Sequence, residues 1–225
     1  MSAHRKGSLL RELPILVAIA VIVSIVIKTF LVQFFYIPSG SMENTLLVND
    51  RVAVNKLGNF FSEVDRGDVV VFRDTAGWLP EESRDFGTGV RDRLREGLVF
   101  IGILPDPAKQ YLIKRVIGVA GDKIVCCDQD DRLTINGIAV DEPYVFPGDK
   151  ASESEFEVTV PEGFIWVMGD HRGASADSRF HRDDANDGFV PLSAVTGRAV
   201  AIVWPIKNIS ILSRYDGLVA GDVNK

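Results

Sequence analysis

Apolar residues fill the first part of the chain almost without interruption. From Leu13 to Ile27 there is no charged residue, and after the single Lys28 the run continues as TFLVQFFYI to Ile37. As a helix, residues 13–37 would reach about 37 Å at roughly 1.5 Å per residue, against a hydrocarbon core of about 30 Å. The run lacks the polar stripe that a buried core helix would keep. The pattern predicts one membrane-spanning helix over residues 13–37, ended by Pro38.

The flanks of this run decide between an anchor and a cleaved secretory signal. A basic start followed by an apolar stretch fits both, but no small-x-small cleavage site follows, only bulky aromatic residues and Pro38. Basic residues outnumber Glu12, the one acidic residue of positions 1–12. We therefore expect an uncleaved anchor with residues 1–12 in the cytoplasm and the chain from about residue 38 outside.

Past residue 38 the pattern changes to short alternating or β-branched segments between turn signals. Eight such segments are typical of strands: RVAVNKL, RGDVVVFR, QYLIKRVIGV, DKIVCC, RLTINGIAV, FEVTV, FIWVMGD and VTGRAVAIVWPI. Asn136 and Gly137 predict a tight hairpin turn. A longer helix is expected only around DRLREGLVF, residues 92–100. The fold class is therefore mainly β and antiparallel.

Two polar segments and one cysteine pair punctuate this pattern. Residues 74–108 interrupt the strands, and residues 81–97 within them hold nine charges and three glycines, which predicts an exposed insertion. A second polar loop is expected at residues 146–157. The only cysteines, Cys126 and Cys127, are adjacent. Two thiols on a strand are favoured over a vicinal disulfide, and neither arrangement forms a metal site.

The charge balance argues against a nucleic-acid partner. The net charge is −6, and after Lys28 there are 21 basic and 30 acidic residues, with no basic stripe that would bind phosphates. The chain is 46% hydrophobic, which allows a sizeable core.

A first candidate site joins Ser39 and Ser41, directly after the apolar run, to Lys114 in the segment YLIKRVIGV. A serine hydroxyl is a weak nucleophile and needs a base, and a lysine can serve if burial keeps its amine neutral. Strand alternation places Lys114 on the face of Leu112 and Val116, which favours burial over a surface position.

A second candidate is the stretch GDHRGASADSRFHRDD, residues 169–184. Its His171 is a candidate base for a Ser/His/Asp triad, and a polar loop fixed by its own Asp and Ser hydrogen bonds is an equally open interpretation. A metal site is a further alternative, although the spacing fits no strong zinc or calcium pattern. Its candidate ligands are Asp170, His171, Asp177, His181, Asp183 and Asp184.

Five ordered boxes resemble those of bacterial type I signal peptidases, in a form similar to the actinobacterial branch. They are PSGSMENTL (38–46), NDRVAVNKL (49–57), RGDVVVF (66–72), IKRVIGVAGD (113–122) and GDHRGASADSR (169–179). The resemblance implies a membrane-bound serine endopeptidase that removes signal peptides from exported preproteins with a Ser/Lys dyad and no cofactor or metal.

The resemblance also implies a role for individual residues. Ser41 is the nucleophile, Lys114 the general base, and the Ser39 hydroxyl and the Ser41 amide form the oxyanion hole. Ser175 is expected to hydrogen-bond and orient Lys114, beside a supporting ion pair of Asp177 and Arg179. Shallow pockets for small substrate residues are expected from four apolar side chains: Ile37, Leu46, Val71 and Val116. His171, Gly173 and Ala174 depart from the commonest form of the last box, GDNRDNSxDSR, which leaves open whether His171 tunes the pH profile.

The implied architecture is a signal-peptidase-type β catalytic core, residues 38–121 and 163–215, with a smaller inserted β extension, residues 122–162, and a C-terminal tail, residues 216–225. The implied location is the bacterial cytoplasmic membrane, with a single pass, an extracytoplasmic catalytic domain, and the lipid bilayer and the secretion translocon nearby. Two alternatives remain. Self-cleaving repressors share the dyad but lack an anchor, and a membrane-tethered, non-catalytic β domain would bind peptides or cell-envelope partners by strand addition.

Overall fold

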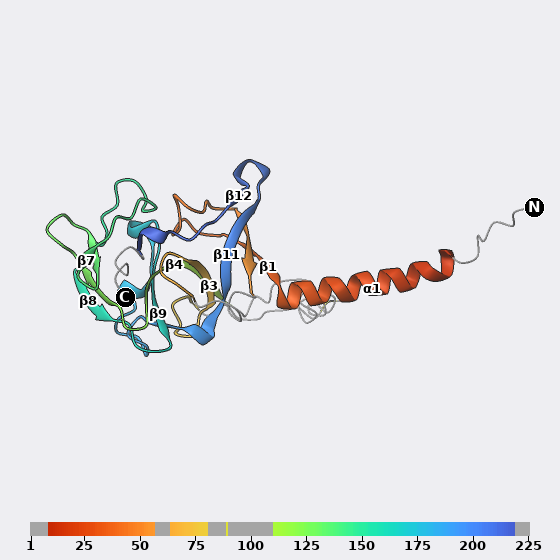
Figure 1. Ribbon diagram of the computed structural model, residues 1–225, viewed down its shortest axis with the longest axis horizontal. Coiled ribbons are helices and arrows are strands. Elements are labelled where there is room, and N and C mark those ends of the chain that lie inside the picture. Colours follow the sequence, from red (N-terminus) through yellow and green to blue (C-terminus); the bar gives the residue numbers. More distant parts are fainter. Residues whose placement is uncertain (1–8, 57–63, 81–88, 90–109, 219–225) are drawn as a thin grey trace, which may run out of the picture.

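Two antiparallel sheets form the body of the molecule, and one helix projects away from it (Figure 1). The computed structural model describes residues 9–56, 64–80, 89 and 110–218. The larger sheet has the strand order β1-β2-β11-β3-β4-β9-β10, with β12 paired to β11, and the smaller sheet has the order β7-β6-β5-β8. The mainly β fold class is confirmed.

The described elements have the following bounds. The larger sheet contains β1 (Val32–Tyr36), β2 (Arg51–Asn55), β3 (Val69–Arg73), β4 (Tyr111–Val119), β9 (Phe164–Met168), β10 (Val190–Pro191), β11 (Val195–Trp204) and β12 (Ser210–Ile211). The smaller sheet contains β5 (Lys123–Cys126), β6 (Leu133–Ile135), β7 (Ile138–Ala139) and β8 (Phe156–Thr159). The helices are α1 (Leu9–Phe30) and the short 3-10 turns η1 (Arg172–Ala174), η2 (Ser178–Phe180), η3 (Leu192–Ala194), η4 (Ile206–Asn208) and η5 (Asp216–Leu218). Every segment predicted as a strand contains one, whereas β1, β10 and β12 were not predicted.

The sequence predicted one helix up to Pro38, but the apolar run divides into a helix and a strand. Helix α1 ends at Phe30, and residues 32–36 form β1, which pairs antiparallel with β2 from Val32↔Asn55 to Tyr36↔Arg51. Phe34 and Tyr36 are exposed, while Phe35 packs against a buried cluster, so the side chains alternate as in a strand. Its exposed and its packed positions alike are filled by aromatic side chains at residues 34–36, and the alternation was therefore hidden in the sequence. In the part of the chain that the structure describes, no helix is long and apolar enough for a membrane crossing.

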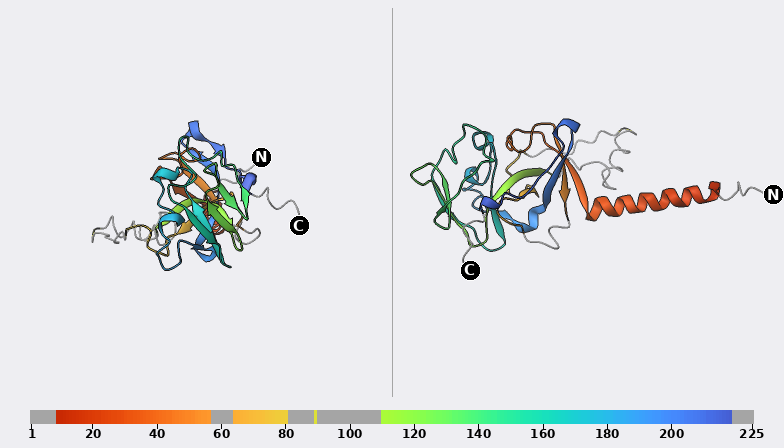
Figure 2. Two further views of the ribbon diagram at one scale, coloured as in Figure 1. Left: turned by 90° about the vertical axis from the view of Figure 1, so that its left-hand side faces the viewer. Right: turned by 45° about the horizontal axis from the view of Figure 1, so that its top comes forward.

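The smaller sheet lies at the far end of the body from α1 (Figures 1 and 2). The predicted hairpin is confirmed: Asn136 and Gly137 adopt positive φ angles of 53° and 82° between β6 and β7. The favoured pair of free thiols is wrong, because Cys126 and Cys127 form a disulfide across a cis peptide bond, with their Cα atoms 3.0 Å apart.

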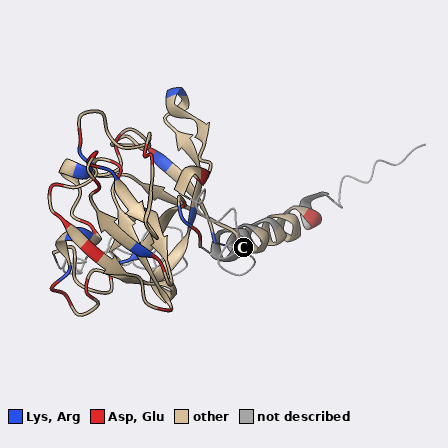
Figure 3. Ribbon diagram, turned by 60° about the vertical axis from the view of Figure 1, so that its left-hand side comes forward, with Lys and Arg blue, Asp and Glu red and all other residues tan. Residues whose placement is uncertain are grey.

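The two sheets share one apolar core. Ile124, Leu133 and Phe156 of the smaller sheet pack in the same cluster as Trp166 and Met168 of β9. Acidic and basic segments are interspersed over the loops and strand ends of the body (Figure 3). The expected helix at residues 92–100 and the charged stretch at residues 81–97 lie almost wholly outside the described residues.

Candidate active site

Ser41 and Lys114, which lie 73 residues apart in the sequence, meet in the interior of the larger sheet. Lys114 Nζ lies 2.6 Å from Ser41 Oγ, within hydrogen-bond distance. Ser41 is only 6% exposed, and Lys114 is only 3% exposed. The structure therefore brings the two predicted dyad residues into direct contact.

Apolar side chains fix the loop that carries Ser41. Met42 and Leu46 are fully buried in the same cluster as Ile37, and the Leu46 amide donates a hydrogen bond to the Met42 carbonyl. The Glu43 amide donates to the Gly40 carbonyl and closes a tight turn around Ser41. This turn, residues 40–43, is called the nucleophile turn below. Because apolar anchors follow the serine directly, the polar turn cannot swing freely into solvent.

Lys114 is held in β4 opposite Val70 of β3, among apolar strands. The pKa of its ammonium is lowered to about 8: burial is the largest cause, Asp177 and Asp170 oppose it with their charges, and Arg179 adds to the lowering. Desolvation penalises the charged form of a buried amine. A substantial fraction of Lys114 is therefore neutral slightly above neutral pH, which is what a proton acceptor for Ser41 requires.

Asp177 and Arg179 form the ion pair that the sequence predicted. Arg179 Nε and Nη2 donate to the two Asp177 oxygens at 2.8 and 2.9 Å, and both side chains are buried. Burial alone would raise the pKa of Asp177, but the bonds and charge of Arg179 and the Gly169 amide lower it below its ordinary value. Asp177 is thus a permanent negative charge close to Lys114.

Ser175 lies beside the Ser41 backbone but does not make the expected bond to Lys114. Its Oγ is buried, and it acts on the neighbouring Asp177 carboxylate, whose pKa it helps to lower, rather than on Lys114. Gly169 separates the two serines: a Cβ at this position would collide with the Ser175 side chain and with the Ser41 carbonyl oxygen. Only glycine allows this close approach. The other predicted helper, Ser39, is exposed on the loop before the nucleophile turn.

The predicted pocket residues do not form one lining. Ile37, Leu46 and Val71 belong to one buried cluster. Val116 belongs to a second buried cluster, which also contains Val70. All four predicted residues are at most 2% exposed. They contribute to the core, and Val116 is separated from the other three because it lies on the opposite face of the sheet.

Sequence reasoning missed the network behind the nucleophile turn. Arg115 donates to both oxygens of Asp170, at 2.8 and 2.6 Å, and to Thr45 Oγ1 at 3.1 Å, while its guanidinium lies 4.1 Å from the centre of the Tyr144 ring. Asn44 Nδ2 donates to the Tyr144 carbonyl at 3.0 Å. A usable signal was present, since an arginine inside an apolar strand needs a buried carboxylate partner.

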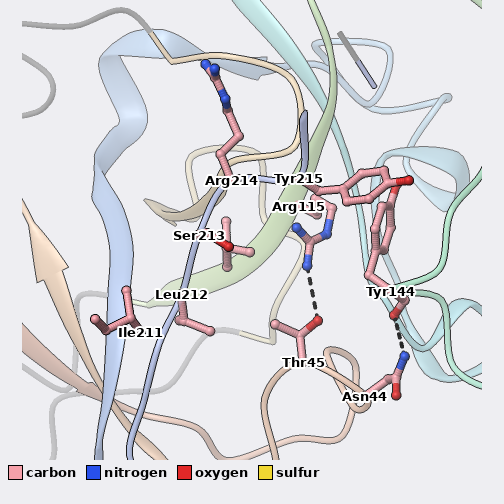
Figure 4. Close-up of a pocket in the computed structure, with 10 residues that line it drawn as sticks. Asn44, Thr45, Arg115, Tyr144, Ile211, Leu212, Ser213, Arg214 and Tyr215 are labelled. Carbon is pink, nitrogen blue, oxygen red and sulfur yellow. Dashed lines mark hydrogen bonds between the residues drawn. The ribbon is translucent and has the colours of Figure 1, made fainter. Parts of the chain in front are cut away.

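A cavity of about 310 Å³ adjoins this network (Figure 4). Thr45, Arg115 and Tyr144 lie on one side of it, and its other walls include Leu212 and Tyr215. Figure 4 shows the bond from Arg115 to Thr45 at the cavity wall. Neither Ser41 nor Lys114 lines it. Ser41 and Lys114 therefore lie outside the lining of this cavity.

The metal and triad interpretations do not match the geometry. In the described residues no group of three or more His, Cys, Asp or Glu side chains is arranged to hold a metal ion. Asp170 and Asp177 are instead paired with arginines, and His181 with Asp184. The His171 ring contacts Glu43, whereas Ser41 Oγ is bonded to Lys114.

Comparisons with known proteins give the following similarities. Residues 10–204 match the family described as signal peptidase, peptidase S26. A signal peptidase I of Mycobacterium tuberculosis is 42% identical over 221 residues, covering 89% of this chain and 74% of the relative. A probable signal peptidase I of Mycobacterium leprae is 38% identical, covering the whole of this chain and 83% of the relative. A crystal structure of a signal peptidase I from Enterococcus faecalis, 25% identical, covers 62% of this chain and 98% of its own at a TM-score of 0.38.

Proposed function

Because this chain belongs to the signal peptidase family, peptidase S26, whose type I members are serine proteases, we propose that it removes N-terminal signal peptides from exported preproteins with a Ser41/Lys114 dyad. The observation that carries the proposal is the 2.6 Å contact between Ser41 Oγ and the amine of a buried lysine whose pKa is lowered to about 8. A hydroxyl beside a neutral amine is an activated nucleophile.

The reaction follows from this contact. Neutral Lys114 takes the proton of Ser41 as Oγ attacks the scissile carbonyl, and the resulting ammonium gives that proton to the leaving amine. Lys114 is then neutral again, takes a proton from the water that attacks the acyl-enzyme, and gives that proton to Ser41 Oγ as its bond to the acyl group breaks. The oxyanion is stabilised by the Ser41 amide and the Ser39 hydroxyl, with each such donor worth about 3 to 4 kcal/mol in other enzymes.

The strand that carries Lys114 offers an edge to an extended substrate. On one side, Tyr111 to Arg115 of β4 pair with β3. On the other side, pairing with β9 begins only at Arg115, and among the described strands none pairs with Leu112–Lys114 there. A peptide added to this edge as a strand would run beside Lys114, and its carbonyl groups would pass Ser41. This placement supports cleavage of an extended segment over cleavage of a folded one.

The membrane location is part of the proposal. Exposed aromatic residues gather at one end of the larger sheet, since Tyr36 and Trp204 both pair with Arg51, and the exposed Ile206 and Ile209 follow. Tyr and Trp favour the interface between lipid and water. From the uncharged run between Leu13 and Ile27, we infer that the apolar N-terminal segment anchors the chain in the cytoplasmic membrane in a single pass, with the N-terminus cytoplasmic, the β domains outside and the secretion translocon nearby. A substrate still held in the bilayer would then reach Ser41 by two-dimensional confinement.

The test is cleavage of a model preprotein by the detergent-solubilised full chain, with the cut site read by mass spectrometry. We expect a cut after a small-x-small sequence that disappears in Ser41→Ala and in Lys114→Ala. Matched controls are Ser154→Ala and Lys123→Ala, which change an exposed serine and an exposed strand lysine and should leave the cut intact.

Two results would contradict the proposal. Cleavage that survives in either dyad variant would rule out the Ser41/Lys114 dyad. A wild-type chain that binds the preprotein but never cuts it would favour the alternative of a membrane-tethered binding domain. The same preparation tests the anchor, because an anchored chain stays in the membrane pellet after an alkaline wash and a peripheral one is released.

A further inference from the structure

The His171 ring lies between two carboxylates next to the nucleophile turn. Its Nδ1 is 3.1 Å from Glu43 Oε2, and its Nε2 is 3.9 Å from Asp149 Oδ2. Phe146 stacks on the ring with a centroid distance of 4.1 Å and an interplanar angle of 15°. The Gly173 amide donates to the same Asp149 oxygen and holds that carboxylate in place. The ring is therefore fixed in orientation, with one nitrogen facing each acid.

His171 also bears directly on the serine. Its backbone amide donates to the Ser41 carbonyl at 3.1 Å. Glu43, which its ring contacts, is the last residue of the nucleophile turn, and the Glu43 carboxyl carbon would lie only 3.0 Å from a Cβ at Gly40. The carboxylate therefore packs across the turn that presents Ser41. Any change in how firmly His171 holds Glu43 acts on the position of the nucleophile.

We propose that His171 is a positioning residue whose protonated imidazole bridges Glu43 and Asp149 and thereby holds the nucleophile turn for catalysis. The inference rests on the proposed function and adds regulation of the same site by pH. A neutral imidazole donates from only one nitrogen, whereas an imidazolium donates from both. Imidazoles commonly change charge between about pH 5 and 8. The charged groups that face the ring are Glu43 from the nucleophile turn and Asp149 from the loop after Phe146.

The bridge and the dyad respond to pH in opposite directions. Lys114 must lose a proton to act as a base, while the bridge is strongest when His171 has gained one. For Lys114 alone, log kcat would rise with a slope of about one per pH unit on the acid side. Because loss of a proton from the imidazole weakens the bridge as pH rises, the wild-type slope should be clearly below one. A positional error in a nucleophile is felt in kcat more than in KM.

The decisive variant is His171→Asn, which keeps an amide donor but cannot titrate. We expect its log kcat to rise with a slope of about one, about tenfold below the wild type near pH 6 and equal to it near pH 9, with KM unchanged. Superimposable normalised profiles, or a change in KM alone, would overturn the inference. Thermal unfolding of each variant establishes that it is folded.

Glu43→Gln provides a second, independent variant, because it removes the charge from the turn at constant size. It should reproduce the slope of about one, and the double variant His171→Asn with Glu43→Gln should be no worse than either single one. Additive losses would contradict a shared bridge. Loss of wild-type cleavage would defeat the proposed function itself, whereas normal cleavage with unchanged slopes defeats only the role of His171.

Discussion

The two sheets differ in what they bury. The residues that β5, β6 and β8 bury are all apolar, among them Ile124, Leu133 and Phe156. In the larger sheet, β4 buries two adjacent cations, Lys114 and Arg115. Burying a charge costs several kcal/mol unless it is paired. Of the two sheets, only the larger one buries charged side chains in its strands, and it buries them next to Ser41.

The difference shows how two neighbouring cations can have opposite tasks. Arg115 is bonded to both oxygens of Asp170 and stays charged as a structural group. Lys114 contacts a neutral hydroxyl instead, so burial lowers its pKa to about 8. Pairing makes one cation permanent, and the lack of a directly bonded carboxylate makes the other available for proton transfer.

The largest expected effect comes from breaking a buried pair of the larger sheet. Asp177→Ala leaves Arg179 buried without its carboxylate and should reduce the free energy of unfolding by roughly 3 to 5 kcal/mol. Asp177 also raises the pKa of Lys114, so its removal should move the acid limb of the activity profile to lower pH. Urea unfolding and a kcat profile measure the two effects.

Asp183→Ala is the matched control, since Asp183 is an exposed aspartate of the same segment and should leave both measurements unchanged. An acid limb that stays in place in Asp177→Ala would show that Asp177 does not act on Lys114.

A cavity created by mutation in the smaller sheet should lower the free energy of unfolding without changing the pH dependence of cleavage. Leu133 is fully buried in the shared core, so Leu133→Ala should cost roughly 2 to 5 kcal/mol. The pH midpoint of kcat should equal that of the wild type, because no charge near Lys114 changes. A shifted midpoint would mean that the smaller sheet tunes the dyad after all.

The smallest expected effect on the free energy of unfolding has the opposite sign, because it is stabilising. Lys114→Met should abolish cleavage yet stabilise the fold by at most about 3 kcal/mol at pH 7. The folded-state pKa of about 8 lies below the ordinary 10.5, so the unfolded chain binds more protons between these values. Wild-type stability should therefore rise with pH through this window, while that of the Met variant should not. Urea unfolding at about pH 7 and pH 10 compares them, and a less stable Met variant at pH 7 would contradict the expectation.

Much of this arrangement could be predicted from the sequence where local pattern and geometry agree. The strand segments, the Asn136–Gly137 turn and the burial of Lys114 all follow from period-two alternation and turn chemistry. The contact between Ser41 and Lys114 was expected from their motifs, and the buried pair of Asp177 and Arg179 was expected in the same way.

The remaining features depend on tertiary partners that no local pattern encodes. Strand β1 was hidden because an apolar strand directly follows an apolar helix, and only its pairing with β2 separates the two. The pair of Arg115 and Asp170 joins residues 55 positions apart. Whether Ser175 bonds to Lys114 depends on side-chain placement around Gly169, which strand periodicity cannot define.

The long sequence separations at the nucleophile turn have a consequence for synthesis. Lys114 follows Ser41 by 73 residues, Asn44 is bonded to a carbonyl 100 residues later, and β2 pairs with β11, which begins at Val195. Contacts of such high contact order form late, because the loops between them must close first. A nascent chain therefore contains Ser41 long before it contains the proposed base, Lys114. The proposed Ser41/Lys114 dyad should therefore assemble only after β11 has left the ribosome.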